Sequence, residues 1–293
     1  MCRFVAYASW QPQTLIDVMG APDLTEFVEL SRLHSDGWGA AWLPSSDDDS
    51  THWESDAKFL ADKGVRLARL RSTLSGRSDP RFADYAGTAR GQAGLMHFRW
   101  ASSGMAVNPA NQHPFASFSS GDEAVFAHNG HIGWVPGLTQ AGRRQWRSAG
   151  MAAPRWQGTT DSERYFWLIR GWHAVGASWP EAVIQTCREI RRLARPCTIN
   201  SVLMTPQELI VVHAAAGMQP RFSEAELDRV AAAGLPRDHT ESYYNVLTRR
   251  SPQQVVVASS GLSSQGWEQV PDETMLVIDL ATLAVATHTI IGQ

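Results

Sequence analysis

The sequence predicts an α+β protein with antiparallel sheets. Short apolar runs typical of strands fill the first half of the chain, helical patterns follow, and strand patterns return towards the C-terminus. This order lacks the strict strand–helix alternation of a parallel doubly wound protein. The length of 293 residues suits one large domain or two small ones.

The first half is predicted to form short strands separated by long loops. The apolar runs that indicate strands are residues 3–9, 39–43, 93–99 and 124–127. The acidic run 44–50 indicates a solvated loop, to which we attach no function. A further loop is expected over 139–158, and its arginines form either a solvated face or a docking patch. These arginines are Arg143, Arg144, Arg147 and Arg155.

Helix-start signals mark the middle of the chain. Residues 160–163 have the S/T-x-x-E form of a capping box, with Thr160 as the capping residue. Ser178 begins a second helix, in which Pro180 occupies the first turn. Apolar residues at helical spacing follow both signals: Tyr165, Phe166, Leu168, Ile169 and Trp172 in the first helix, and Val183, Ile184, Cys187, Ile190 and Leu193 in the second.

The C-terminal part is predicted to return to strands. The strand patterns lie at residues 198–204, 209–214, 254–258, 275–279 and 284–288. Residues 223–233 indicate a short helix between them.

Composition excludes several classes of protein. With 43% hydrophobic and 19% charged residues, the chain is typical of a soluble globular protein. The formal net charge of −3 gives no general attraction to nucleic acid or to an anionic membrane. No run approaches roughly 18 apolar residues, and the apolar piece after Arg3 is too short for a signal peptide. We therefore expect a cytoplasmic protein, with Cys187 and Cys197 as free, buried thiols.

Cys2 is the sharpest chemical feature. Removal of Met1, which is favoured by a small second residue, would make Cys2 the N-terminus. Its own α-amine, with a pKa of about 7.7–8.0, would then serve as a base beside the thiol. One residue would thus supply both nucleophile and base. Cys2 by itself has an ordinary alternative, a second residue that happens to be cysteine.

Ordered motifs follow Cys2. They are 35–39 (SDGWG), 97–102 (HFRWAS), 111–115 (NQHPF), 128–130 (HNG) and 161–163 (DSE). This set resembles the class II glutamine amidotransferases, which begin with Cys and have motifs of the forms HxRxA, NxHPF, HNG and DSE in that order. The resemblance covers at least residues 1–175 and identifies Cys2 as the catalytic nucleophile.

The resemblance implies roles for residues that bind glutamine or stabilise the transition state. Arg99 would hold the α-carboxylate through two parallel bonds, and Asp161 would pair with the α-ammonium. Asn129 and the backbone N–H of Gly130 would receive the oxyanion, a contribution worth roughly 10²–10³ in rate for one donor. The ordinary alternatives are a surface ion pair for Arg99 and an acidic first-turn residue for Asp161.

Other motif residues match positions that line the substrate pocket. These are Trp100, Ser102 and His113. The alternative for His113 is a structural role, as a hydrogen-bonded histidine before Pro114. Asp36, Gly37 and Gly39 are expected to shape the wall behind Cys2. The chain has 12 Trp, most of which we expect in the core, and Trp38 and Trp100 offer aromatic surface to a large leaving group.

No metal or cofactor is expected. Four histidines lie close in sequence, but they form no H-E-x-x-H motif and no C-x-x-C is present. They are His97, His113, His128 and His131. No glycine-rich phosphate-binding motif occurs either.

The C-terminal half indicates a branch of the family. Residues 254–260 (QVVVASS), 266–267 and 270–272 resemble the stand-alone short amidotransferase-like proteins, which include the γ-glutamyl hydrolase of ergothioneine biosynthesis. Ser260 departs from this pattern, since the branch often has Glu there. The motif at 35–39 is also closer to uncharacterised relatives.

The resemblance implies one domain over residues 1–293, a four-layer αββα sandwich of the N-terminal nucleophile hydrolase type. The expected reaction is hydrolysis of a γ-glutamyl amide, glutamine or a conjugate, through a thioester on Cys2. Two alternatives stay open: a glutaminase subunit that delivers ammonia to a separate synthase partner, and a non-catalytic binding protein on the same fold. The expected ligand is a small molecule in every case.

Overall fold

A computed structural model describes most of the chain. The described residues are 2–45, 66–102, 104–119, 122–153, 155–194, 196–218, 222–234, 240, 242–262 and 265–290. Most of the predicted acidic loop at 44–50 lies outside them.

Seven strands form the first sheet, in the order β11-β9-β10-β1-β4-β2-β3. All of its strand pairs are antiparallel. In chain order the strands are β1 (Cys2–Gln13), β2 (Trp38–Pro44), β3 (Ala68–Ser72), β4 (Gly91–Arg99), β9 (Val246–Arg250), β10 (Gln254–Ser259) and β11 (Glu268–Gln269).

Six strands form the second sheet, in the order β13-β12-β8-β7-β6-β5. Its pairs are antiparallel as well. The strands are β5 (Phe115–Ser119), β6 (Asp122–His131), β7 (Thr198–Met204), β8 (Glu208–His213), β12 (Thr274–Asp279) and β13 (Val285–Thr289).

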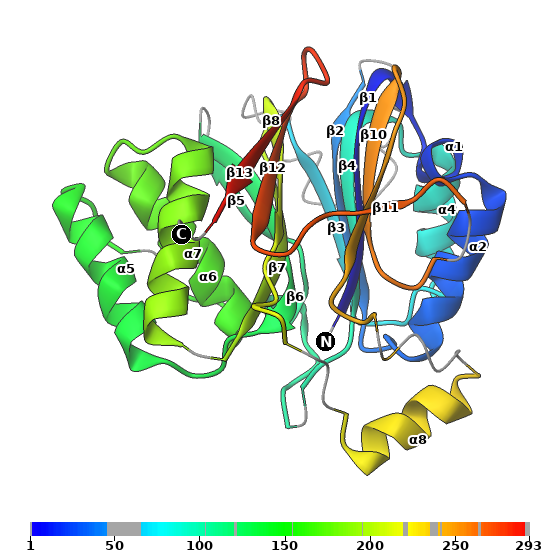
Figure 1. Ribbon diagram of the computed structural model, residues 1–293, viewed down its shortest axis with the longest axis horizontal. Helices are drawn as coiled ribbons and strands as arrows, with labels where there is room; N and C mark the ends of the chain where they lie inside the picture. Colours follow the sequence, from blue (N-terminus) through cyan, green and yellow to red (C-terminus); the bar gives the residue numbers. More distant parts are fainter. Residues whose placement is uncertain are drawn as a thin grey trace.

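The two sheets stack face to face between two helix layers (Figure 1). One layer contains α1 (Leu15–Met19), α2 (Ala21–Glu29) and α4 (Pro80–Thr88), which cover the seven-stranded sheet. The other contains α5 (Pro136–Ser148), α6 (Asp161–Ala174) and α7 (Trp179–Leu193), which cover the six-stranded sheet. This arrangement is the α+β, four-layer αββα sandwich that the sequence predicted. The helix α8 (Glu224–Ala232) lies apart from both layers, and short turns η1 (Leu30–Arg32) and η3 (Pro109–Asn111) complete the fold.

Alternation along the strands builds three cores. On β1, Phe4 and Ala6 belong to the core between the sheets, whereas Val5 and Tyr7 face the layer of α1, α2 and α4. A third core joins the six-stranded sheet to α6 and α7. The parity of each strand therefore decides which of its side chains enter the space between the sheets.

The predicted helix starts are confirmed, with one difference. Ser178 forms a complete capping box with Glu181, and Ser223 forms one with Glu226 at the start of α8. Thr160 accepts a bond from the backbone N–H of Glu163. The Glu163 carboxylate, however, accepts from the backbone of the preceding loop, so only half of the predicted box is present.

Several helices occupy regions that the sequence predicted as loops. Residues 139–148 belong to α5, whose buried face includes Gly142 and Gln145 and so hides the apolar periodicity. A Cβ at Gly142 would lie 2.0 Å from the ring of Trp167, so close packing requires glycine there. The helices α1, α2 and α4 have only 5, 9 and 9 residues, too few for a clear helical pattern.

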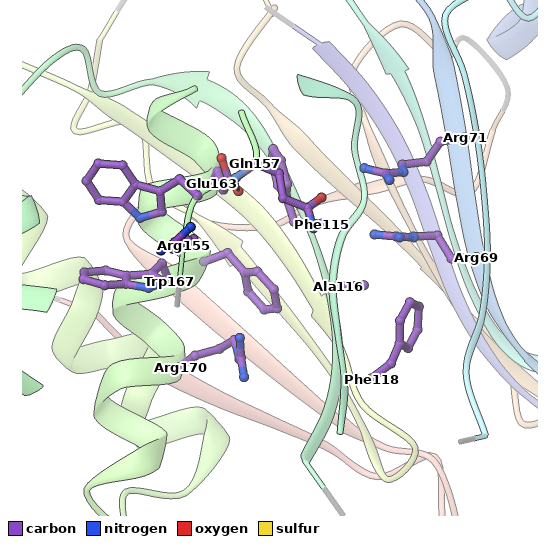
Figure 2. A pocket seen from close by; sticks show the side chains of 12 residues that line it. Arg69, Arg71, Phe115, Ala116, Phe118, Arg155, Gln157, Glu163, Trp167 and Arg170 are labelled. Atoms are coloured by element: carbon purple, nitrogen blue, oxygen red, sulfur yellow. Dashed lines mark hydrogen bonds between the residues drawn. The ribbon is translucent and has the colours of Figure 1, made fainter. Parts of the chain in front are cut away.

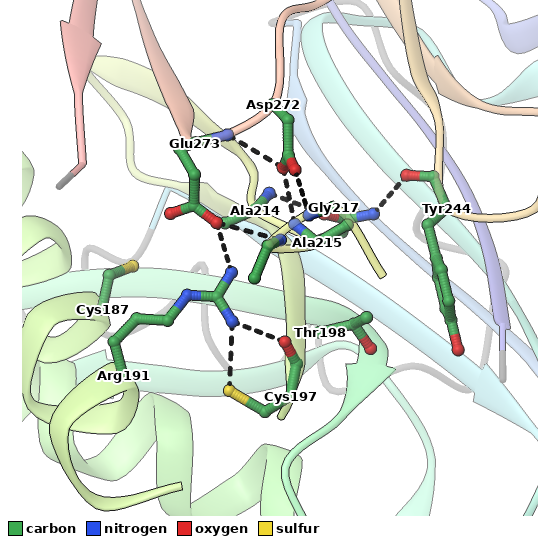
Figure 3. A network of polar contacts seen from close by, with 12 residues as sticks. Cys187, Arg191, Cys197, Thr198, Ala214, Ala215, Gly217, Tyr244, Asp272 and Glu273 are labelled. Carbon is green, nitrogen blue, oxygen red and sulfur yellow. Dashed lines mark hydrogen bonds and ion pairs between the residues drawn. The ribbon is translucent and has the colours of Figure 1, made fainter. Parts of the chain in front are cut away.

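The two remaining cysteines are free and buried, as predicted. Cys197 also accepts a bond to its sulfur from Arg191 at 3.2 Å. Arg191 pairs with Glu273, beside Asp272, whose carboxylate accepts from the backbone of Ala215 and Gly217 (Figure 3). This network ties the end of α7 to the segment before β12.

Candidate active site

Cys2 begins β1 and faces the space between the two sheets. Its parity matches that of Phe4, and its side chain is 7% exposed. The backbone nitrogen of Cys2 donates to Asn129 Oδ1 at 3.0 Å, across 127 residues of sequence. The sulfur lies 4.0 Å from the carbonyl oxygen of Trp100. The nucleophile candidate is therefore buried and held through its own nitrogen.

Asn129 connects the two sheets at this end. It lies on β6, where Val125 and Ala127 have the same parity and belong to the core between the sheets. Its side chain is fully buried. While Oδ1 accepts from Cys2, the donor Nδ2 has no hydrogen-bond partner in the part of the chain that the structure describes. A buried donor without an acceptor costs about 1–3 kcal/mol, so it needs an explanation.

Gly130 follows Asn129 at a point where no side chain fits. A Cβ there would lie 2.1 Å from the carbonyl oxygen of Thr198 and 2.5 Å from Nε2 of His128. His128 itself is fixed between Ser162 Oγ, 2.9 Å from Nδ1, and Thr198 O, 3.0 Å from Nε2. The HNG motif thus combines a donor, a close backbone approach and a fixed histidine.

Arg99 lies directly opposite Cys2 in the β1–β4 register. Its guanidinium is buried and donates to the carbonyl of Ala106 from Nη1 at 3.4 Å and from Nη2 at 3.3 Å. Burial lowers the pKa of Arg99, while the nearby charges of Cys2 and Asp36 favour the cation. Among the described residues no carboxylate forms an ion pair with Arg99 within 4.0 Å, so the site presents a buried positive charge next to the thiol.

Asp36 and Gly37 build the wall around these residues. Asp36 Oδ2 accepts from the backbone of Ala101 at 2.8 Å, and its carbonyl accepts from Gln112 Nε2 at 2.6 Å. Gly37 has a φ of +116°, and a Cβ there would lie 2.4 Å from Gln112 Nε2. These contacts support the structural role expected from the sequence.

The His113 ring packs against the His97 ring at an interplanar angle of 40°. Their ring centroids are 4.3 Å apart, and both side chains are buried. Burial lowers the pKa of His97 to about 3 and holds the pKa of His113 well below its usual value. Burial also lowers the pKa of His128, although Asp161 opposes the shift. All three histidines are therefore neutral at neutral pH.

Asp161 lies at the start of α6, at the far side of His128. Its Oδ2 accepts from the backbone of Ile132 at 2.8 Å and of Gly133 at 3.0 Å. Burial opposes its ionisation, but the neighbouring His128 ring and these two N–H groups hold its pKa below the usual value. The described hydrogen bonds join Asp161 to the segment after β6 and to the Ser162 hydroxyl, and not to Cys2 or Arg99.

The remaining candidates lie at different depths. The Trp100 ring is 3% exposed and packs at 5.6 Å from the His34 ring and beneath Arg229 of α8. Ser102 is exposed, in the turn closed by its carbonyl and the backbone of Met105. Trp38 is fully buried and donates to Asp79 Oδ2 at 3.0 Å. The expectation that Trp38 offers surface to a leaving group is therefore wrong, because its parity turns it towards the helix layer.

Sequence reasoning missed Arg3. This side chain is fully buried, and its Nη1 donates to the carbonyls of Cys2 and Tyr243, each at 3.2 Å. The guanidinium lies 3.7 Å from the centre of the Tyr243 ring. Arg3 thus fixes the peptide of the nucleophile from the side opposite to Asn129. A charged residue directly after Cys2 in an otherwise apolar strand was the available signal.

The described residues contain neither a candidate metal cluster nor a helix that could span a membrane. No group of three or more His, Cys, Asp or Glu side chains there could hold a metal ion. Within the same residues, no helix is long and apolar enough to cross a membrane.

The chain belongs to the class II glutamine amidotransferases, because the model of that family matches residues 21–290. Cys2 precedes the matched residues. Membership supports release of the glutamine amide as the general activity. A search of curated proteins found no match.

Solved structures support the same fold. Glutamine phosphoribosylpyrophosphate amidotransferase from Bacillus subtilis matches with a TM-score of 0.61 and 14% identity, over 100% of this chain and 50% of that one. A glutamine aminotransferase class-II domain protein from Silicibacter pomeroyi has a TM-score of 0.57 and 19% identity, over 99% and 100%. A predicted glutamine amidotransferase from Pseudomonas aeruginosa has a TM-score of 0.51 and 15% identity, over 96% and 98%. The chain spans half the length of the first of these.

Proposed function

We propose that the protein hydrolyses a γ-glutamyl amide through a thioester on Cys2 and releases glutamate and an amine or ammonia. One observation supports this most directly. Asn129 holds the nitrogen of Cys2 with Oδ1 and keeps Nδ2 buried without a described acceptor. A single side chain thereby positions the base and presents a donor to the oxyanion that forms beside the thiol.

The proposed reaction begins once Met1 has been removed, so that the nitrogen of Cys2 is an amine. The amine takes the thiol proton, and the sulfur attacks the γ-carbonyl carbon. Asn129 Nδ2 and the Gly130 N–H stabilise the oxyanion of the tetrahedral intermediate. The C–N bond then breaks as the ammonium returns its proton to the leaving amine. Water attacks the thioester, glutamate leaves, and the thiol is restored.

Substrate recognition is proposed to use the charges around Cys2. Arg99 would hold the α-carboxylate, which is supported by its burial and by its position opposite Cys2. Asp161 would pair with the α-ammonium through Oδ1, which accepts only from the Ser162 hydroxyl at 3.3 Å among the described residues, whereas Oδ2 accepts from two backbone N–H groups. His113, Trp100 and Ser102 would complete the pocket.

A second candidate function is a glutaminase subunit that delivers ammonia to a separate synthase. It is favoured by the first similar structure, an amidotransferase of which this chain spans only half. The exposed arginines of α5, Arg143, Arg144 and Arg147, would then be the docking patch. Partner-free glutaminase turnover separates the two functions. Labelling of Cys2 by a glutamine-like reagent would exclude a non-catalytic binding protein.

The deciding measurement is kcat/KM for glutamine against a panel of N-substituted γ-glutamyl amides. We expect a larger amide to exceed glutamine, because a hydrolase that frees a useful amine needs no route for ammonia. If glutamine is better by tenfold or more, about 1.4 kcal/mol in transition-state binding, the ammonia-donor function replaces this proposal.

A further inference from the structure

A cationic cavity lies at the open edge of the sandwich, away from Cys2. It is bounded by β3 and β5, the edge strands of the two sheets, and by α6 with the segment 155–157 before it (Figure 2). Its volume is about 260 Å³. None of the contacts described for Cys2, Asn129 and Arg99 involves a residue that lines this cavity. The proposed reaction therefore does not account for it.

Four arginines belong to the lining of this cavity. Arg69 and Arg71 come from β3, Arg155 from the segment before α6, and Arg170 from α6. The two β3 residues alternate with Ala68 and Leu70, which belong to the helix-side core. Inward positions of the neighbouring strands hold apolar residues of the core between the sheets. Both side chains are half-buried, and each donates to a backbone carbonyl, Arg69 to Pro114 and Arg71 to Gln112.

The negative charge among the described lining residues is held by backbone N–H groups. Glu163, the one acidic residue among the described lining residues, accepts from the backbone of Gln157 at 2.7 Å and of Gly158 at 2.8 Å. Arg170 pairs with Asp122 at 3.5 Å, outside the lining. Arg155 is exposed and forms no hydrogen bond or ion pair with another described residue. The lining therefore favours an anion.

Buried donors in the lining indicate the same partner. Trp156 Nε1, Trp167 Nε1 and Arg170 Nε are buried and have no acceptor among the described residues. All three are donors, so the group that would satisfy them must be an acceptor. Phosphate and carboxylate oxygens are strong acceptors and pair well with guanidinium groups.

Aromatic rings supply the rest of the wall. Phe115 and Phe118 come from β5, and the Trp156 and Trp167 rings meet edge to face at 5.7 Å. The Arg69 guanidinium lies 5.1 Å from the centre of the Phe118 ring. Flat apolar surfaces beside guanidinium groups suit a ligand with an aromatic body and an anionic end.

We propose that this cavity binds a small organic anion, a phosphate ester or carboxylate attached to a flat apolar body. The volume limits the ligand to a small molecule. The anionic end would meet the arginines and the unsatisfied N–H groups, and the body would pack on the aromatic rings. Binding at this site is independent of the proposed hydrolysis, and the two proposals can fail separately.

The test is calorimetric titration of the full chain with phenyl phosphate, benzoate, inorganic phosphate and phenol. We expect saturable binding of phenyl phosphate or benzoate, and the tighter of the two identifies the anionic group. Inorganic phosphate and phenol, which each represent half of the ligand, should bind at least tenfold more weakly. Absence of saturable binding by both aromatic anions, or equally tight binding of inorganic phosphate, would overturn the proposal.

Variants locate the binding. Arg155→Ala removes an exposed lining charge without a described partner, and we expect it to weaken binding about tenfold. Arg147→Ala, on the exposed face of α5 outside the cavity, removes the same charge and should change nothing. Arg69 and Arg71 are less suitable, because they also donate to the carbonyls of Pro114 and Gln112. An equal loss of affinity in Arg155→Ala and Arg147→Ala would indicate a non-specific electrostatic attraction to the protein surface. It would contradict a defined binding site in this cavity.

Discussion

The middle and one end of the space between the sheets are built by the same strands but contain opposite kinds of side chain. In the middle, β1 contributes Phe4 and Ala6, and β6 contributes Val125 and Ala127. Two residues further along the same faces stand Cys2 and Asn129. Burial is equally complete in both regions, so exposure does not explain the change from apolar to polar.

The difference lies in how the buried groups are satisfied. Apolar side chains in the middle gain free energy when they leave water, about 25 cal/mol per Å². At the end, Asn129 Nδ2 and the ring nitrogens of His113 are buried without a hydrogen-bond partner in the described structure. Such groups weaken the fold, which is expected where a site is prepared for a substrate. The space between the sheets therefore stabilises the protein in its apolar middle and contains unsatisfied polar groups at its polar end.

Loss of the nucleophile should give the largest effect. Cys2→Ala removes the attacking sulfur but keeps an inward side chain at the end of β1, so turnover should fall by about 10⁴-fold or more with an intact fold. Steady-state kinetics and circular dichroism measure the two properties. The intact mass of the active wild type should correspond to a chain without Met1. A glutamine-mimicking diazoketone should label Cys2 alone.

The control for Cys2→Ala is Cys187→Ala. The Cys187 sulfur lies 3.2 Å from the hydroxyl of Tyr165 in the helix-side core, so this change should lower stability and spare turnover. A label found on Cys187 or Cys197 would refute the assignment of Cys2.

Acid should destabilise the polar end specifically. The pKa values of His97, His113 and His128 are lowered in the folded protein, that of His97 to about 3, against about 6.5 when unfolded. Below pH 6.5 the unfolded state binds more protons, so stability falls as the pH falls. At one pH unit below 6.5, His97 alone contributes about 1.4 kcal/mol of lost stability, and the lowered pKa values of His113 and His128 act in the same direction.

Urea unfolding at pH 5.5 and 7 tests this dependence. His113→Phe should reduce the difference between the two midpoints, whereas His288→Gln, on exposed β13, should leave it unchanged. Equal midpoints at both pH values would mean that the buried histidines take up protons without cost.

The oxyanion donor gives the next effect. Asn129→Asp keeps an oxygen acceptor for the nitrogen of Cys2 but replaces the donor Nδ2 with an oxygen. We expect kcat to fall about 10²–10³-fold, or roughly 2.7–4 kcal/mol. Single-turnover kinetics on a γ-glutamyl amide would measure the step directly.

Asn200→Asp is the matched control for this change. Asn200 faces Asn129 in the β6–β7 register, but its Nδ2 already donates to the carbonyl of Tyr244 at 2.7 Å. This variant should lose stability and retain kcat. If both variants lost only stability, Asn129 would be a structural residue.

Substrate recognition should show the smallest of these effects. Arg99→Lys retains the charge and loses the planar pair of donors, so KM should rise about tenfold for substrates with a free α-carboxylate. Arg90→Lys, on an exposed position, serves as the control. An unchanged KM in Arg99→Lys would place carboxylate recognition elsewhere.

The sequence predicted the fold class and most of the later elements, because capping residues and β-branched runs are local signals. It did not predict α5, whose buried face includes a glycine and a glutamine, or the short helices before β4. The contact between Cys2 and Asn129 followed only from the family resemblance, since no local pattern relates residues 127 positions apart. Arg3 was missed because its role depends on Tyr243, at the other end of the chain. The face of the sheet on which the Trp38 side chain lies depends on the alternation of side chains along β2, which only the structure fixes.

The pairing of Cys2 with Arg99 has a consequence for how the substrate range of such a protein changes. Both residues lie on one antiparallel ladder, where a slip of one residue would turn every side chain to the opposite face. The α-carboxylate and the reacting carbonyl of a substrate would therefore be bound by rigid strands that tolerate little variation. The leaving group would meet the connecting segments after β4 and β6, which can change in length and composition without disturbing the ladder. New substrates can then arise by exchanging loops around an unchanged reaction centre.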